Sequence, residues 1–284
     1  MIALTKRNLL IFFRDKSAVF FSFLAVFIII GLYALFLGDV WVESFSDIEG
    51  VRYLMDSWIM AGVLAVTSLT ATMGAFSAMV DDKTKKIIKD INSAPVKRSA
   101  VTASYILSSY IIGVIMSLAS LVLAEIYIVA YGGELMDVVT LIKVILLILF
   151  SCLANIPLLL FVVSFFNSSS AFAAASTILG TLIGFLTGIY LPVGNLPESV
   201  QLIVKLFPPS HAAALFRQVM TADAAKVSFN GAPAQALNEF NEFLGVTFRF
   251  GDYTVTPWAS VIILVATAAV FYLLSIVNMS RKKR

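Results

Sequence analysis

The longest uncharged stretch of the chain, residues 144–197, reads VILLILFSCLANIPLLLFVVSFFNSSSAFAAASTILGTLIGFLTGIYLPVGNLP. It holds 54 residues between Lys143 and Glu198. One helix of that length would be about 81 Å long, whereas about 20 apolar residues already cross the ~30 Å hydrocarbon core of a membrane. The stretch must therefore fold back on itself. The polar cluster NSSS at 167–170, near its middle, marks the break between two predicted spans.

The composition of the whole chain agrees with a membrane environment. Of 284 residues, 60% are hydrophobic and 13% are charged, and the mean hydropathy is +0.96. Soluble domains carry roughly 25% charged residues, so this chain is predicted to be a polytopic, all-α membrane protein. Four further uncharged runs, of 22, 24, 26 and 28 residues, bring the predicted count to six spans. They lie near 17–38, 57–80, 101–131, 138–166, 171–191 and 257–278.

The same composition excludes several function classes. With a single cysteine, Cys152, and a single histidine, His211, we expect no disulfide framework and no metal site. A lone histidine without a paired acid or nucleophile does not predict catalysis, so we expect no catalytic residues. The net charge of +3 on so apolar a chain does not indicate a nucleic-acid partner.

The basic residues are distributed unevenly between the predicted spans. Residues 1–16, the loop 81–98 and the tail 281–284 together hold 14 of the 20 Lys and Arg residues. The positive-inside rule therefore places both termini and this loop in the cytoplasm, as an even number of spans requires. We expect a multi-pass protein of the cell membrane, in bacteria the plasma membrane. The three tryptophans then fall near outer span ends, as in an aromatic belt: Trp41, Trp58 and Trp258.

Two cytoplasmic segments are predicted to be short helices. Residues 1–16 alternate apolar and basic positions, which is typical of an amphipathic helix on the membrane surface, although they can equally serve as flanking anchors of the first span. In the loop 81–98, DDKTKKIIKDINSAPVKR, the acidic pair at 81–82 is a candidate helix cap and Pro95 a candidate stop. Its three isoleucines predict an apolar ridge for a protein partner: Ile87, Ile88 and Ile91. The alternative is a basic loop on anionic headgroups.

Small residues and prolines in the fifth span and after it predict how the chain packs and folds there. Gly180, Gly184 and Gly188 recur every four residues in the fifth span and predict a close-packing face, within one subunit or across a dimer. After this span, the prolines break residues 192–218 into two short helices, which we expect to enter the outer leaflet and return. Residues 222–256 are predicted to form a small outer cap with one helix and one β-hairpin.

Few polar residues interrupt the predicted spans. Glu125, near the outer end of the third span, is interpreted as an interfacial residue or a residue of the transport pathway. Asn155, two residues before Pro157, predicts a packed kink or a substrate contact. Ion-coupled carriers usually need ionisable groups at membrane depth, so this scarcity favours a different energy source.

The outer hairpin resembles that of the permease subunits of ABC type-2 exporters. The positions that carry the resemblance are Gly188, Pro192, Pro197, Pro208, His211 and Arg217. The six spans fit the same family, the amphipathic start is similar to its connecting helix, and the loop 81–98 is similar to its coupling helix. The cap at 222–256 is longer than the minimal form of the family.

The resemblance implies a single membrane domain, 1–284, that works with other subunits. It implies two cytoplasmic ATPase subunits, which bind ATP and Mg²⁺, and a second permease, identical or homologous. The ATPase would contact the coupling helix at Lys86, Ile87, Ile88, Ile91 and Pro95. The chain has no G-x-x-x-x-G-K-[ST] phosphate loop of its own.

The function so implied is export of an amphipathic substrate, such as a drug, an antimicrobial peptide or a lipid, and hence multidrug efflux. Two other classes stay open from the sequence. One is an ATP-independent carrier or channel, and the other is a membrane scaffold that transports nothing.

Overall fold

The computed structural model describes residues 1–281, so the last three residues of the predicted basic tail lie outside it. The described chain is 81% helical and has six helical segments long and apolar enough to span a membrane. These segments are 16–44, 51–84, 98–130, 138–164, 169–186 and 257–278. The prediction of an all-α protein with six spans is therefore confirmed.

The elements follow one another along the chain with short connections. The first half comprises α1 Ile2–Arg14, α2 Lys16–Leu32, the π-helical turn Tyr33–Leu37, α3 Gly38–Ser44, α4 Val51–Ala75, α5 Ser77–Thr84, α6 Ile87–Ser93 and α7 Arg98–Ala130. The second half comprises α8 Val138–Ser164, α9 Ser169–Leu186, the 3₁₀ turn Val193–Asn195, α10 Glu198–Leu206, α11 Pro208–Met220, α12 Ala222–Ser228, α13 Ala234–Phe243, the antiparallel strands β1 Arg249–Phe250 and β2 Tyr253–Thr254, and α14 Pro257–Arg281.

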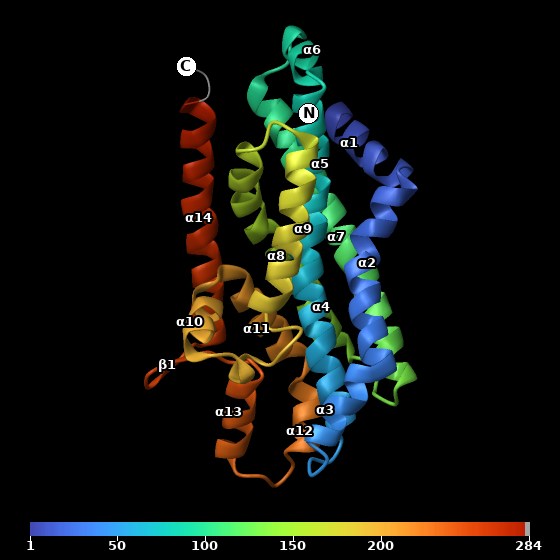
Figure 1. Cartoon of the computed structure of the whole chain (residues 1–284), viewed down its shortest axis with the longest axis vertical. Coiled ribbons are helices and arrows are strands. Elements are labelled where there is room, and N and C mark those ends of the chain that lie inside the picture. The colour runs from blue at the N-terminus through green and yellow to red at the C-terminus, as the bar shows by residue number, and fades with distance from the viewer. Residues whose placement is uncertain (282–284) are drawn as a thin grey trace.

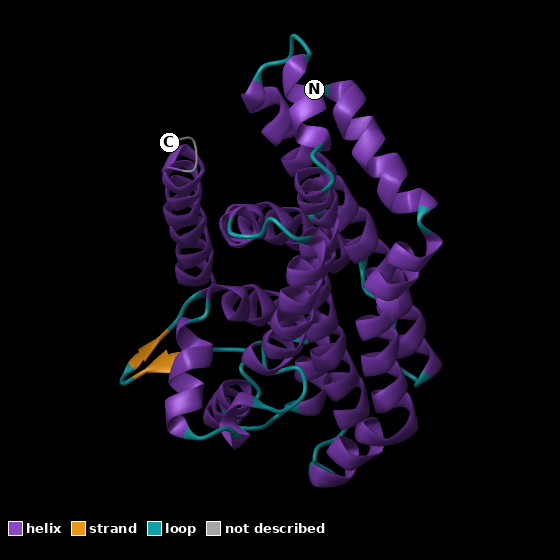
Figure 2. Ribbon diagram, turned by 45° about the horizontal axis from the view of Figure 1, so that its top comes forward, coloured by secondary structure: helices purple, strands orange, loops and turns teal. Residues whose placement is uncertain are grey.

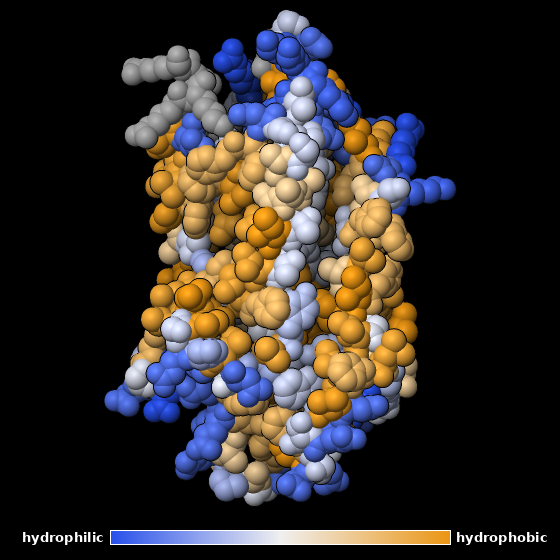
Figure 3. All heavy atoms as spheres, in the orientation of Figure 1, coloured by the Kyte–Doolittle hydropathy of each residue, from blue (hydrophilic) through white to orange (hydrophobic). Residues whose placement is uncertain are grey.

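The long helices run between two polar ends of the molecule. One end, the α6 end, carries α6, the start of α1 and the last turns of α14; the other, the cap end, carries α3, α12 and α13 (Figure 1). A broad apolar belt separates the two polar ends on the face seen in Figure 3. Such a belt is what a bilayer-spanning bundle presents to lipid.

Helix α4 forms the centre of the bundle. In the span 51–84, 89% of an apolar stretch of 18 residues is buried. The corresponding share is 17% in the spans that contain α2, α9 and α14. Its hydroxyl side chains find partners on their own helix: Thr67, Ser68 and Thr72 donate to the carbonyls of Val63, Ala65 and Ser68. The polar residues of this span are thus compatible with close helix packing, and they do not by themselves indicate a pathway.

The break in the 54-residue uncharged run lies where the polar cluster predicts it. Helix α8 ends at Ser164, and α9 begins at Ser169 with the Ser168 hydroxyl accepting from the Ala171 amide. At the far end of α9, Gly188 has a φ of 67°, and its amide donates to Phe185 at 3.0 Å. The fifth span therefore ends at Leu186 and not at 191, because the glycine closes the helix with a left-handed cap.

The outer hairpin and the cap follow this glycine. Pro197 is the N-cap of α10 and Pro208 is the first residue of α11, as the missing N–H of proline favours. Two short helices therefore occupy this stretch as expected, with α11 extending to Met220, and their entry into the outer leaflet stays a prediction. In the cap, α13 is the expected helix, while the β-hairpin is smaller than expected, with two residues in each strand (Figure 2).

The structure corrects the role of one tryptophan. Trp58 is completely buried, and its indole Nε1–H donates to the Leu244 carbonyl at 2.8 Å. It therefore does not belong to a lipid-facing aromatic belt, because α4 is surrounded by other helices and by the cap. Trp258, at the start of α14, is 77% exposed and suits the belt.

Candidate functional site

Helix α1 is held against the α6 end by a cluster of polar side chains. Its buried residues, Thr5, Asn8 and Phe12, recur at helical spacing on one face. Arg7 donates two hydrogen bonds to the Asp82 carboxylate, at 2.6 and 2.8 Å. The Tyr105 hydroxyl of α7 donates to the same carboxylate at 2.5 Å. The amphipathic start of the chain is thus bound to the bundle by its polar side chains as well as by Phe12.

Charge holds this cluster together. The hydrogen bond from Arg7 to Asp82 raises the pKa of the guanidinium, so the pair stays ionised. Asp82 is almost completely buried, whereas the Arg7 side chain is about a third exposed. We call Arg7, Asp82 and Tyr105 the α6-end cluster.

Helix α6 projects beyond this cluster and does not begin as predicted. Asp81 and Asp82 lie inside α5 and do not cap α6; instead Lys86 precedes α6, with a φ of 62°. That left-handed conformation is uncommon for a residue with a Cβ atom and stores backbone strain at the turn. The predicted stop at Pro95 agrees with the end of α6 at Ser93.

The predicted isoleucine ridge is only partly exposed. Ile87, Ile88 and Ile91 are all half-buried, and Ile91 packs against the main hydrophobic core. Ile91 therefore anchors α6 to the molecule, because it faces inward. Lys86 is fully on the surface, and Ile87 lies beside it at the exposed start of the helix.

A large groove opens beside α6. Its volume is about 1060 Å³, and it lies among α5, α6, α7, α8 and α14. Basic residues line it on the side of α6: Lys83, Lys86, Lys89 and Arg98. Apolar and aromatic residues line it toward the membrane belt, among them Ile106, Leu160 and Tyr272. The groove therefore combines a cationic mouth with an apolar wall.

At the cap end, Arg217 organises the outer hairpin. It is completely buried and donates to the Gly188 carbonyl at 3.0 Å and the Gly245 carbonyl at 3.3 Å. Its guanidinium also lies 4.7 Å from the centre of the Trp58 ring. Burial lowers the pKa of Arg217 to about 9, which leaves it cationic at neutral pH. One side chain thus joins the end of α9, helix α4 and the cap.

His211 fastens the other side of the hairpin. Its Nε2 lies 3.0 Å from the Lys205 carbonyl, and its Nδ1 lies 3.1 Å from the Ser260 hydroxyl at the start of α14. Because a carbonyl only accepts, Nε2 carries the proton and Nδ1 accepts from the serine. Burial lowers the pKa of His211, in agreement with a neutral ring. The two partners are a backbone carbonyl and a serine hydroxyl, and neither is a carboxylate, so we interpret both contacts as structural.

Comparison with known families decides the identity of the fold. Residues 42–277 match the model of the ABC-2 family transporter proteins. The chain belongs to the ABC-2 transporter family. No curated protein sequence matches it. The matched segment contains α6, the outer hairpin and the cap, whereas α1 and α2 precede it.

Membership defines the chain as a permease subunit of an ABC transporter. In this family the membrane subunit is distinct from the ATPase and associates with ATPase subunits. The resemblance inferred from the outer hairpin is thereby confirmed. Among the described residues, no group of three or more His, Cys, Asp or Glu side chains is placed to hold a metal ion.

The three glycines of the fifth span have different environments. Gly180 has open space where a Cβ atom would be, and Gly184 lies against the ring of Tyr190. Gly188 is the cap of α9 already described, so it does not extend the packing face. Gly180 is thus half-buried beside open space, and Gly184 provides the room for Tyr190.

The two candidate pathway residues lie in separate places. Asn155, on α8, is buried and donates to the Ser68 hydroxyl of α4 at 3.5 Å. Glu125, on α7, lies near the cap end and accepts from the Met136 amide at 3.1 Å. Asn155 is thus part of a helix interface, and Glu125 is not near it.

Sequence reasoning missed the residues of the α6-end cluster and the cationic contact of Trp58. From the sequence, Asp82 was interpreted only as part of a helix cap. Its partners, Arg7 and Tyr105, are distant in the sequence and could not be inferred. The signal that was present is an acidic residue at the edge of an apolar span, where an unpaired charge is costly. That signal predicts a partner but does not say which residue it is.

Proposed function

We propose that this chain is the membrane subunit of an ATP-driven exporter that moves an amphipathic substrate outward. Two ATPase subunits, which bind ATP and Mg²⁺, would dock at the α6 end, and a second permease would complete the pathway. In this proposal the α6 end is cytoplasmic and the protein lies in the cell membrane. The cap end, with the outer hairpin, then faces outward.

The observation that carries the proposal is the position of α6. This short helix lies beyond the apolar belt, at the end that also holds the basic residues of α1 and of the 81–98 loop. Its start would offer an ATPase a charged contact at the exposed Lys86 and an apolar contact at the half-buried Ile87, with Ile88 and Pro95 beside them. Ile91 would carry motion of α6 into the bundle, because it packs against the core.

The groove beside α6 supports an amphipathic substrate class. Its cationic mouth and apolar wall suit a molecule with an anionic or polar head and an apolar body. The volume of about 1060 Å³ is at the upper end of small-molecule sites, which run to roughly 1,000 Å³. A substrate would reach this groove from the inner leaflet.

The docking role of α6 can be tested with a double variant, Lys86→Glu with Ile87→Asp. We expect it to lose at least tenfold in ATPase co-purification and in substrate-stimulated ATP hydrolysis, because both contacts change while the core contact of Ile91 stays. Val227→Asp is the matched control, since Val227 is 53% exposed at the cap end. Normal assembly and ATP hydrolysis in the double variant would reject α6 as the docking helix.

The dimer face can be tested at Gly180. A Cβ atom at Gly180 would meet no other atom of the subunit within 4 Å, so we expect Gly180→Trp to fold and to reduce the dimer fraction several-fold. Leu146→Trp, at a 58% exposed position on α8, is the matched control. Mass photometry in mild detergent gives the dimer fraction. An unchanged fraction would move the second permease to another face.

A further inference from the structure

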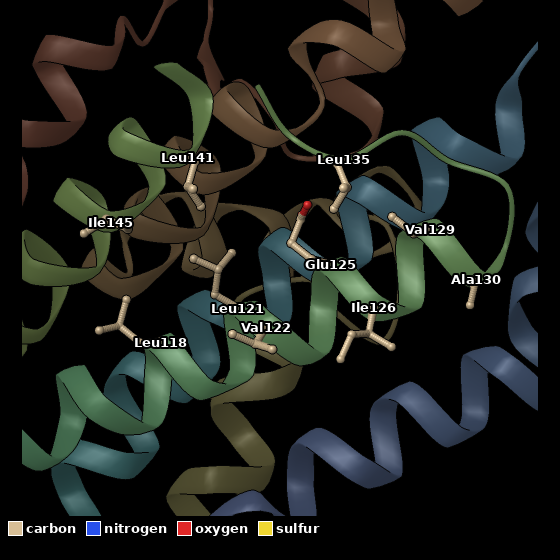
Figure 4. Close-up of a pocket in the computed structure, with 10 residues that line it drawn as sticks. All are labelled: Leu118, Leu121, Val122, Glu125, Ile126, Val129, Ala130, Leu135, Leu141 and Ile145. Atoms are coloured by element: carbon tan, nitrogen blue, oxygen red, sulfur yellow. The ribbon is translucent and has the colours of Figure 1, made fainter. Parts of the chain in front are cut away.

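A second groove lies between α7 and α8 near the cap end, far along α7 from the groove beside α6. Its volume is about 610 Å³, and nine of its ten lining residues are apolar. They are Leu118, Leu121, Val122, Ile126, Val129, Ala130, Leu135, Leu141 and Ile145. Figure 4 shows them around the tenth residue, Glu125.

The carboxylate of Glu125 is only half satisfied. Its Oε2 accepts the Met136 amide proton at 3.1 Å, while its Oε1 is buried and has no hydrogen-bond partner. In Figure 4 the carboxylate points into the groove, between Leu135 and Leu141. A buried carboxylate oxygen without a partner is costly, so the groove lacks one hydrogen-bond donor at this point.

The described part of the chain does not supply that donor. Glu125 takes part in none of its salt bridges, and its Oε1 receives no hydrogen bond. Glu134 and Asp137 are exposed on the 131–137 loop, and two exposed lysines, Lys143 and Lys226, lie close enough to Asp137 to offset its charge. The preference of the groove for a cation therefore depends on Glu125, the one charged residue in its lining.

The groove is open toward the lipid side of the bundle. Val122, Ile126 and Leu135 are 58%, 60% and 71% exposed. A ligand dissolved in the membrane can therefore enter sideways, with its apolar part remaining against hydrocarbon throughout. The volume falls within the roughly 300–1,000 Å³ of drug-sized sites.

We propose that this groove binds a single-chain amphiphile that carries one ammonium group. The ammonium N–H donates to Oε1 of Glu125, and the hydrocarbon body lies along the apolar residues of α7 and α8. This charge-assisted hydrogen bond supplies the missing donor in a water-poor site. A phospholipid fits less well, because its anionic phosphate would lie close to the carboxylate of Glu125.

Binding can be measured without ATP and without an ATPase subunit, so its failure would leave the proposed export function untouched. The full chain is placed in phosphatidylcholine nanodiscs and titrated with n-dodecylammonium, with empty nanodiscs subtracted. We expect saturable binding that is at least tenfold tighter than that of dodecanol, and none that saturates for dodecyl sulfate.

Two variants test the charge and the volume of the site separately. Glu125→Gln keeps an oxygen for the Met136 amide and removes the charge, and we expect at least a tenfold weaker affinity. Val122→Trp fills the groove and keeps the charge, and we expect a similar loss, which also covers the case in which the glutamine variant fails to fold. Glu198→Gln, at an exposed position outside the lining of the groove, is the matched control for surface charge and should change the affinity less than twofold.

Three results would overturn the proposal. One is unchanged dodecylammonium binding in both Glu125→Gln and Val122→Trp, and another is dodecanol binding as tightly as dodecylammonium. The third is loss of dodecylammonium binding when phosphatidylethanolamine is added to the nanodiscs, which would identify a zwitterionic lipid as the occupant.

Discussion

A cluster of one Arg, one Asp and one Tyr lies at each end of the α4–α7 helix pair, in which α5 continues from α4. The two clusters are arranged differently. At the α6 end the arginine belongs to α1, and its hydrogen bonds to Asp82 join residues 75 positions apart. Tyr105 donates to the same carboxylate at 2.5 Å. Asp82 thus receives bonds from two separate helices.

At the cap end the arginine and the aspartate share one helix. Arg52 lies one turn before Asp56 on α4, with Nε and Oδ2 3.0 Å apart. Tyr127 donates to Asp56 at 3.4 Å, a longer and weaker bond. Arg52 has further partners, since it also pairs with Asp39 at 2.6 Å and lies 4.3 Å from the centre of the Tyr131 ring. We call Arg52, Asp56 and Tyr127 the cap-end cluster.

The difference concerns what each cluster can do. An Arg–Asp pair within one helix forms whenever the helix forms, so the cap-end cluster stiffens α4. A pair between two helices forms only when the helices are docked. The hydrogen bonds between Arg7 and Asp82 therefore form only while α1 is docked against the bundle. The α6-end cluster thus depends on the docking of α1, whereas the Arg52–Asp56 pair does not depend on another helix.

The largest effect is expected from Asp82→Ala. It removes three hydrogen bonds and leaves Arg7 and Tyr105 without their shared partner. We expect the free energy of unfolding to fall by about 2–3 kcal/mol, less than the ~3–5 kcal/mol for a fully buried pair, because Arg7 is partly hydrated. Thermal unfolding measures the loss, and hydrogen exchange should rise across α1. Asp90→Ala, at an exposed position on α6, is the control, and equal exchange in both variants would refute the docking role.

A smaller effect is expected from Asp56→Ala. Arg52 keeps Asp39 and the Tyr131 ring, so the cost should be about 1–2 kcal/mol. Hydrogen exchange in α1 should not change, since α1 lies at the other end of the molecule (Figure 1). If Asp56→Ala lowered the free energy of unfolding more than Asp82→Ala does, the cap-end cluster would be the more important of the two for stability.

The smallest effects separate the two tyrosines. Tyr105→Phe removes one of the three bonds to Asp82 and should cost about 1 kcal/mol, whereas Tyr127→Phe should cost less than about 0.5 kcal/mol. Both substitutions keep the ring and its packing. Chemical or thermal unfolding of the two variants side by side gives the comparison, and equal losses would show that the difference in bond length has no energetic consequence.

Much of the fold could be predicted because it depends on local properties. Span lengths follow from the uncharged runs, and the ends of α6 and α10 lie beside prolines, which act on their own neighbours. The end of α9 was misplaced by five residues because Gly188 was assigned to a packing face, although a glycine near a helix end is also a common cap.

The candidate sites were predictable in outline only. The six-residue pattern of the outer hairpin identified the family, and the family model confirms it. The burial of Arg217 against Trp58 did not follow from that pattern, because the two residues lie on different helices. Likewise Ile91 was placed on an exposed ridge, since periodicity gives the face of a helix and not what covers it.

The sequence alone determined the membrane environment, the number of spans, the short helices between them and the family. Each of these depends on hydropathy, helix-breaking residues or a motif within a short stretch. Only the tertiary structure decided that Asp82 binds Arg7 and Tyr105, and that one oxygen of Glu125 faces an apolar groove without a partner. A buried polar group needs a partner wherever it is, but the identity of that partner depends on which distant segments pack beside it.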